Sequence, residues 1–111
     1  MKNFITPNNI TIILGQNDIE NWEIIINYKK INQNYIWMHL DSYPSGHIII
    51  LSEIIDNELL KYAGNICKEN TKYRNIPNLK LCYTKLSNIK KGDKAGEVYF
   101  KQNKLVNFIK I

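Results

Sequence analysis

The chain has 111 residues, which is enough for one folded core and too little for two independent ones. A hydrophobic fraction of 44% excludes a disordered chain, and a net charge of +5 favours an anionic partner. No apolar run approaches the ~20 residues of a membrane span or provides the core of a signal peptide. We therefore expect one domain over residues 1–111, working in the cytoplasm and away from membranes.

The first third of the chain predicts a strand followed by a helix. Ile10–Leu14 is a β-branched run ended by Gly15, which is typical of a strand. Asn17 and Glu20 form a capping-box pattern, so a helix should begin there and end near Lys29. Helical spacing predicts that its buried face consists of Ile19, Trp22 and Ile26.

A hairpin and a second helix follow. Two strands are predicted at Tyr35–Leu40 and His47–Leu51, joined by the turn Ser42–Gly46. Asp56 or Asn57 caps the next helix, which must end before Pro77. The spacing of a buried helical stripe is shown by Leu59, Leu60, Ala63, Ile66 and Cys67.

The last third predicts mainly strands. Leu79–Thr84 has a clear strand pattern, and Lys90–Gly96 is predicted to be a basic loop. We expect Glu97–Phe100 and Leu105–Ile109 to pair with each other as a closing hairpin. The predicted fold is therefore a mostly antiparallel sheet carrying two helices, in the α+β class.

Both histidines adjoin one turn. Trp37 and His39 share one face of a predicted strand, because side chains alternate along it. Ser45 and His47 lie across the turn, so two imidazoles, an indole and a hydroxyl converge at one edge of the sheet. The alternative is a core tryptophan with two locally hydrogen-bonded histidines. A serine nucleophile activated by His47 lacks an obvious orienting carboxylate, although Asp41 is near in sequence.

The sequence favours neither a metal nor a cofactor. Zinc needs about four ligands at short spacing, and His39 and His47 supply only two. Cys67 and Cys82 belong to a buried helical stripe and a strand, so both are expected to be free, inert thiols. Neither GxxxxGK[ST] nor GxGxxG occurs, so there is no standard phosphate-binding loop.

Positive charge is concentrated late in the chain. Residues 1–55 hold three lysines against five acidic residues, a balance of −2; residues 56–111 hold eleven lysines and Arg74 against five, a balance of +7. The segment Asn70–Arg74 ends the second helix, where the helix dipole itself favours cations. With Lys90, Lys91 and Lys94 it is predicted to form one basic surface, in which Tyr73 or Arg74 stacks on a base. A merely solvated basic face gives the same composition.

Taken in chain order, these landmarks resemble the NFACT-R domain, the RNA-binding module of the NFACT proteins. The resemblance runs from about Ile10 to Ile109. The chain is similar to the short eukaryotic members of the family, although their coiled coil is missing here. The matching landmarks are Gly15, Asn17-Asp18, Trp37-x-His39, Ser45-Gly46-His47, Thr71-Lys72-x-Arg74, Tyr83-Thr84, Ile89-Lys90-Lys91 and Gly96-x-Val98.

One motif departs from the family. Bacterial and archaeal members typically have Pro-Gly-Ser-His at the turn, whereas this chain has Pro44-Ser45-Gly46-His47. The exchanged order puts the role of Ser45 in question. The RNA-binding residues that the resemblance implies are Trp37, His39, Ser45, Gly46, His47, Lys72, Arg74, Thr84, Lys90 and Lys91.

Two functions remain open from the sequence. The resemblance implies a non-catalytic module that recognises structured RNA, either tRNA or ribosomal RNA, in translation or ribosome-associated quality control. A ribosomal subunit is then a candidate partner. The alternative is a small enzyme acting on nucleic acid, with His39 and His47 as general acid and base. The sequence favours the module, because a third catalytic partner is missing.

Overall fold

The computed structural model describes residues 1–111 as an antiparallel six-stranded sheet, a separate two-stranded ribbon and two helices. The sheet has the order β1-β2-β4-β3-β5-β8. Its strands are β1 (Lys2–Ile5), β2 (Thr11–Leu14), β4 (Ile48–Ile50), β3 (Ile36–Leu40), β5 (Lys80–Lys85) and β8 (Asn107–Lys110). The other elements are the helices α1 (Asp18–Ile31) and α2 (Asn57–Glu69), the ribbon strands β6 (Ile89–Lys91) and β7 (Val98–Phe100), and the 3-10 turns η1 (Leu86–Asn88) and η2 (Asn103–Leu105).

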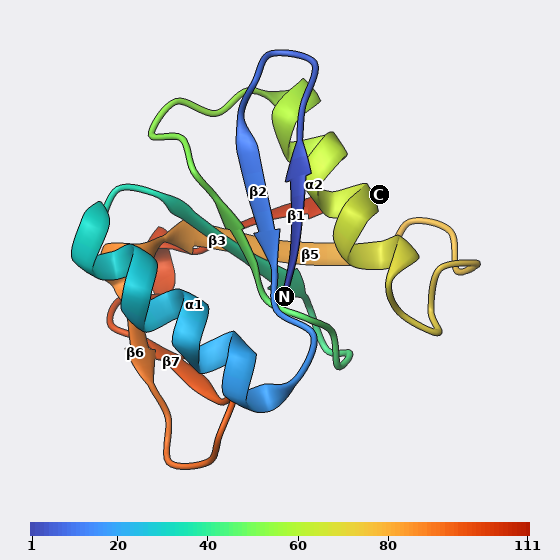
Figure 1. Ribbon diagram of the computed structural model, residues 1–111. Coiled ribbons are helices and arrows are strands. Elements are labelled where there is room, and N and C mark those ends of the chain that lie inside the picture. Colours follow the sequence, from blue (N-terminus) through green and yellow to red (C-terminus); the bar gives the residue numbers. More distant parts are fainter.

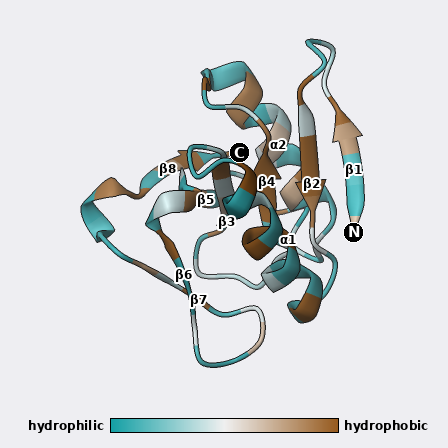
Figure 2. Ribbon diagram, turned by 60° about the vertical axis from the view of Figure 1, so that its left-hand side comes forward, coloured by the Kyte–Doolittle hydropathy of each residue, from teal (hydrophilic) through white to brown (hydrophobic).

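The sheet carries a hydrophobic core on each face. One core lies under α2, where Met38 and Ile48 pack against Leu60 and Cys67. The other lies under α1 and the ribbon, where Trp37 packs with Ile24, Ile25 and Ile89. Figure 1 shows the two helices and the ribbon around the sheet, and Figure 2 shows hydrophobic colour along the neighbouring strands β2 and β4. The α+β class with two helices and a mostly antiparallel sheet is therefore confirmed.

Both helices begin where their capping residues predict. The Asn17 side chain accepts a hydrogen bond from the Glu20 amide at 2.9 Å, and the Asp56 carboxylate accepts one from the Leu59 amide at 2.8 Å. Each cap satisfies a backbone N–H group that a helix end otherwise leaves unpaired. The return bond of the first cap goes from the Gln16 amide to the Glu20 carboxylate.

The predicted buried face of α1 is wrong at Ile19, whereas Trp22 and Ile26 are half-buried. Ile19 is 65% exposed, and the fully buried positions are Asn21, Ile24 and Ile25. The run Ile24–Ile26 presents apolar side chains on several sides of the helix, so spacing did not select one stripe. Asn21 is buried because its side chain accepts a hydrogen bond from the His47 amide, a long-range interaction that no local pattern contains.

The predicted closing hairpin is also wrong. β7 pairs with β6, not with β8, and β8 joins the edge of the main sheet beside β5. Lys90 and Lys91 therefore belong to a strand, and only the residues after Lys91 form the predicted loop. The edge strand β1 was not predicted at all, since its four residues carry no alternating pattern. The sequence favoured residues 105–109 as the partner of β7 because the true partner, β6, is only three residues long and is too short to show a strand pattern.

A buried asparagine, Asn88, stabilises this strand pairing. The Asn88 amide donates to Thr84 Oγ1 at 3.1 Å and to the Gln102 carbonyl at 3.0 Å. Its side-chain oxygen accepts the Gln102 amide at 2.8 Å. Asn88 thus joins the end of β5 to the segment that leaves the ribbon, and sends the chain back to the sheet edge.

We expect Asn88→Leu to destabilise the fold by about 1–3 kcal/mol, because similar volume is kept while buried partners lose their hydrogen bonds. Urea unfolding measures this. Asn103→Leu, at an exposed asparagine nearby, is the matched control and should be close to neutral. Equal stability of the two variants would contradict the role given to Asn88.

Candidate nucleic-acid interface

Three aromatic side chains converge at the β3–β4 turn, as the sequence predicts. The Trp37 and His39 rings lie parallel on the same face of β3, with centroids 5.8 Å apart. His47 meets both edge-on, at 5.5 Å from Trp37 and 4.9 Å from His39. Trp37 and His47 are almost fully buried, whereas His39 is partly exposed. His39 is therefore the member of the cluster that reaches the surface.

The hydrogen bonds determine the tautomer of each imidazole. Trp37 Nε1 donates to His47 Nδ1 at 3.1 Å, and an indole nitrogen can only donate, so Nδ1 of His47 is unprotonated. His39 Nδ1 bonds the Leu40 carbonyl, which can only accept, so this Nδ1 carries a proton. Burial lowers the pKa of His39, and burial together with His39 lowers the pKa of His47 to about 3. Both rings are consequently neutral near pH 7.

The cluster borders a pocket of about 430 Å³ between the β3–β4 turn and the ribbon. This volume lies within the range of small-molecule sites. Phe100 of β7 contributes one wall, with its ring edge-on to Trp37 at 5.5 Å. Tyr43, Asp41 and Glu97 complete the rim. We call this feature the histidine pocket.

The Ser45–Gly46 turn is built into the core from both sides. Ser45 Oγ accepts a hydrogen bond from the Leu40 amide at 3.1 Å and from the Cys67 thiol at 3.5 Å. A Cβ on Gly46 would lie 2.2 Å from the Gly15 carbonyl oxygen, which is backbone and cannot move aside easily. Ser45 thus has internal partners, and position 46 requires glycine for its close approach to another segment.

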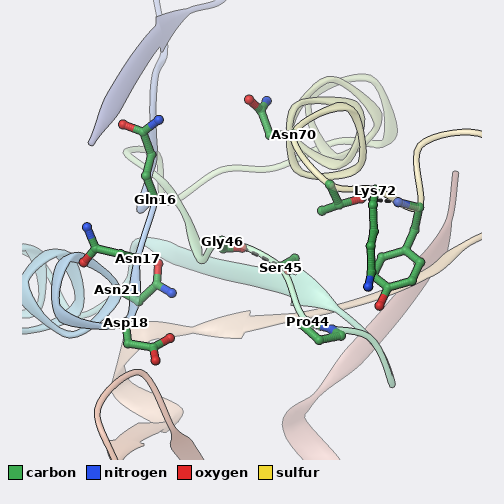
Figure 3. A pocket seen from close by; sticks show the side chains of 11 residues that line it. Gln16, Asn17, Asp18, Asn21, Pro44, Ser45, Gly46, Asn70 and Lys72 are labelled. Carbon is green, nitrogen blue, oxygen red and sulfur yellow. Dashed lines mark hydrogen bonds between the residues drawn. The ribbon is translucent and has the colours of Figure 1, made fainter.

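A second, polar pocket of about 320 Å³ lies on the far side of this turn. Figure 3 shows it between Gln16–Asn21 at the start of α1 and Asn70–Lys72 after α2, with Pro44–Gly46 between them. Lys72 lies over the Tyr73 ring at 5.5 Å. The Tyr73 ring in turn contacts Tyr43, with centroids 4.6 Å apart, so this pocket and the histidine pocket share an aromatic boundary.

A groove of about 500 Å³ between α1 and β6 is the most basic feature of the fold. Five lysines and no acidic residue line it, and the lysines are Lys29, Lys30, Lys90, Lys91 and Lys101. Lys29 Nζ donates to the Ile89 carbonyl at 2.6 Å. Burial, followed by the nearby charge of Lys101, lowers the pKa of Lys29. We call this feature the lysine groove.

The predicted RNA-binding residues at the surface are divided among the histidine pocket, the polar pocket and the lysine groove. Lys90 and Lys91 line the lysine groove, whereas Lys72 lines the polar pocket and Arg74 follows it on an exposed loop. Figure 1 shows segment 70–78 apart from β6 and β7, so Lys72 and Arg74 do not line the lysine groove, and a single RNA-binding surface formed by both groups stays a prediction.

Sequence patterns alone missed three groove lysines. Lys29, Lys30 and Lys101 come from two segments that only the fold brings beside β6. The Lys-Lys pair near the end of α1 was the one available signal, and such a pair is equally typical of a helix end.

One other predicted site residue, Thr84, and both cysteines are internal. Thr84 is buried, and its hydroxyl donates to the Leu105 carbonyl at 3.0 Å and accepts from Asn88, so its interaction with RNA stays a prediction. Cys67 and Cys82 are free and buried as expected, and burial raises the pKa of each thiol to about 11. Neither thiol is therefore an activated nucleophile.

Fold and site together define a small α+β domain with a neutral histidine pocket and a lysine groove. The chain belongs to the family described as the NFACT protein RNA binding domain, whose model matches residues 1–102. It is 24% identical over 102 residues to the Rqc2 homolog RqcH of Bacillus subtilis, and 28% identical over 100 residues to Protein JLP2 of Saccharomyces cerevisiae. The matches include 90% and 81% of this chain but only 18% and 48% of the relatives, so the chain spans less than half the length of either.

A solved structure has the same fold. The C-terminal part of the fibronectin/fibrinogen-binding protein from Streptococcus suis superposes with a TM-score of 0.84 over 98% of this chain and 43% of that one, at 18% identity. The resemblance inferred from the ordered motifs is thus confirmed at the level of family and fold. No helix here has the length and apolar character needed to cross a membrane.

We expect restoration of the common family order, Ser45→Gly with Gly46→Ser, to destabilise this chain by several kcal/mol. The new side chain would meet the Gly15 carbonyl, and Leu40 and Cys67 would lose their Ser45 partner. Thermal unfolding of the double variant measures the effect. Ser45→Gly alone is the control and should account for a minor part of the loss. An unchanged midpoint of the double variant would show that the turn has room for either order.

We also expect the free energy of unfolding to decrease steeply as the pH is lowered from about 6.5 to about 3. An unfolded His47 takes up a proton near its ordinary pKa of 6.5, whereas the folded one does so only near 3. The unfolded state therefore binds more protons in this window, and acidification favours unfolding by an amount on the order of a few kcal/mol.

Urea midpoints across this range measure the effect, with His47→Gln as the control because Gln can accept from Trp37 but does not titrate. His39, which contacts His47 and whose pKa is also lowered by burial, is present in both proteins. Parallel curves for the two proteins would show that His47 is not the source.

Proposed function

We propose that this domain binds structured RNA, tRNA or ribosomal RNA, without performing chemistry on it. Membership of the NFACT RNA-binding family supports RNA as the ligand. RqcH of Bacillus subtilis, described as an Rqc2 homolog, supports a role in ribosome-associated quality control in the cytoplasm, with a ribosomal subunit as partner. The observation that carries the proposal is the lysine groove.

The lysine groove suits the sugar-phosphate backbone. Its five lysines come from α1, β6 and the segment after β7, so the rigid fold fixes their mutual positions. No acidic side chain lines it, and the mutual repulsion of Lys29 and Lys101 is relieved when an anion enters. Phosphates held at fixed positions by folded RNA gain more from such a surface than those of a flexible strand.

The neutral imidazoles favour binding over catalysis. A general acid must carry a proton near the working pH, yet burial lowers the pKa of both His39 and His47. Nδ1 of His47 is also occupied by the Trp37 indole. The pair therefore suits fixed hydrogen bonding to a ligand better than proton transfer.

We expect Lys30→Gln with Lys90→Gln to weaken tRNA binding and to lower the slope of log affinity against log salt by roughly one for each phosphate that is no longer neutralised. Both side chains are exposed, so folding should be unaffected. The matched control is Lys104→Gln with Lys110→Gln, which removes the same charge from exposed positions outside the groove. Titrations at several salt concentrations measure both. Equally weakened binding in the two double variants would leave net charge, and not the groove, as the cause.

The class of nucleic acid is tested with the same titrations. We expect tRNA to bind more tightly than an unstructured RNA strand or a DNA duplex of equal length. Equal affinity for all three would reduce the domain to a general polyanion binder, and no binding to any of them near physiological salt would reject the proposed function.

A further inference from the structure

The histidine pocket differs from the lysine groove in a way that identifies a different part of the RNA. Its lining includes His39, Tyr43 and Phe100, and the Asp41 carboxylate lies close enough to act on His39. A phosphate entering there would meet negative charge and uncharged imidazoles. The pocket therefore suits a flat, uncharged group.

The two imidazoles present one donor and one acceptor. With Nδ1 of His47 accepting from Trp37, the remaining proton of that ring is on Nε2. With Nδ1 of His39 donating to Leu40, its Nε2 is left with a lone pair. Both rings line the pocket, and the side-chain hydrogen bond of His47 uses its Nδ1 and leaves its Nε2 for a ligand. His39 lies close to the Ser45 backbone as well as to Leu40. The burial that keeps both rings neutral preserves this pattern near pH 7.

A donor beside an acceptor is the pattern that matches the Watson–Crick edge of an unpaired base, where an N–H or amino group adjoins a carbonyl or ring nitrogen. Every base offers such a pair, so the pattern recognises an unpaired base in general and not one sequence. A base in a duplex has this edge occupied and is excluded.

The surroundings of the pocket suit the rest of such a nucleotide. Tyr43 is 39% exposed at the rim and contacts Tyr73, which gives a second stacking surface beside the entrance. Lys72 lies over the Tyr73 ring, and exposed Arg74 follows, so cations are available for the flanking phosphates. On the opposite rim the ribbon strand β7 leads to β6, whose Lys90 and Lys91 line the lysine groove.

We propose that the pocket formed by His39, His47 and Phe100 holds one unpaired nucleobase of the bound RNA. The base is inserted between the ribbon and the β3–β4 turn, with its edge hydrogen-bonded to the two Nε2 atoms. This inference rests on the proposed function, because the lysine groove supplies most of the affinity for the RNA.

The test uses an RNA stem-loop that carries a short single-stranded tail, and the same molecule with an abasic tail. Both probes have identical phosphates, so the lysine groove and Lys72 meet the same charge in each. We expect the natural tail to bind roughly tenfold more tightly, the size of effect that one stacked base gives. The natural and abasic probes are titrated against the unmodified protein in parallel.

Two variants at one position assign the difference to the pocket. His39→Leu removes the acceptor and should bind both probes with the affinity that the unmodified protein has for the abasic one. His39→Gln keeps a side-chain acceptor and should restore part of the preference. His39 is partly exposed, and thermal unfolding shows whether each variant folds. Charge changes in the lysine groove, by contrast, should weaken both probes alike.

The outcomes separate this inference from the proposed function. Equal binding of natural and abasic tails by the unmodified protein would overturn the base pocket while RNA binding stands. A preference for the natural tail that persists in a folded His39→Leu protein would place the base elsewhere and also overturn it. Failure to bind either probe would overturn both proposals together.

Discussion

The hydrogen bond from the Trp37 indole to His47 Nδ1 is the constraint on which the rest of the site depends. It joins β3 to the residue that precedes β4 inside the core, and it excludes a proton from one nitrogen of His47. Protonation of Nδ1 would place two N–H groups face to face, and burial, followed by the charge of His39, lowers the pKa of His47 to about 3. Because Trp37 also stacks on His39, this bond fixes the orientation of the cluster, while burial keeps both imidazoles neutral.

Backbone interactions hold this bond in place from the other side. The Gly15 amide donates to the His47 carbonyl at 3.0 Å, and the His47 amide donates to the Asn21 side chain at 3.1 Å. A Cβ on Gly46 would meet the Gly15 carbonyl, and a Cβ on Gly15 would meet Asn21, so neither position has space for a side chain. The start of α1, the end of β2 and the turn are thereby fixed as one unit. The unusual order Ser45-Gly46 is the order that this packing accommodates.

The parts of the fold that could be predicted are those encoded locally. Three local predictions were correct: the caps at Asn17 and Asp56, the buried stripe along α2, and the placement of Trp37 beside His39. Each depends only on residues a few positions apart in the sequence. The pairing of β8 with β5 was missed because it depends on buried Asn88, whose partners are up to 14 residues away. Burial of Asn21 has the same kind of cause.

The lysine groove shows why charge counted along a sequence differs from charge on a surface. Lys29 and Lys30 belong to the half of the chain with a balance of −2, yet they line the same groove as Lys90 and Lys91. Acidic residues of the same half lie elsewhere: Glu20 pairs with the N-terminal amine, and Asp41 lies 4.0 Å from Lys80. The fold thereby concentrates positive charge on one side of the ribbon and keeps the imidazoles of the histidine pocket uncharged on the other. Affinity from phosphates and selectivity for a base edge can then vary independently, because no residue lines both places.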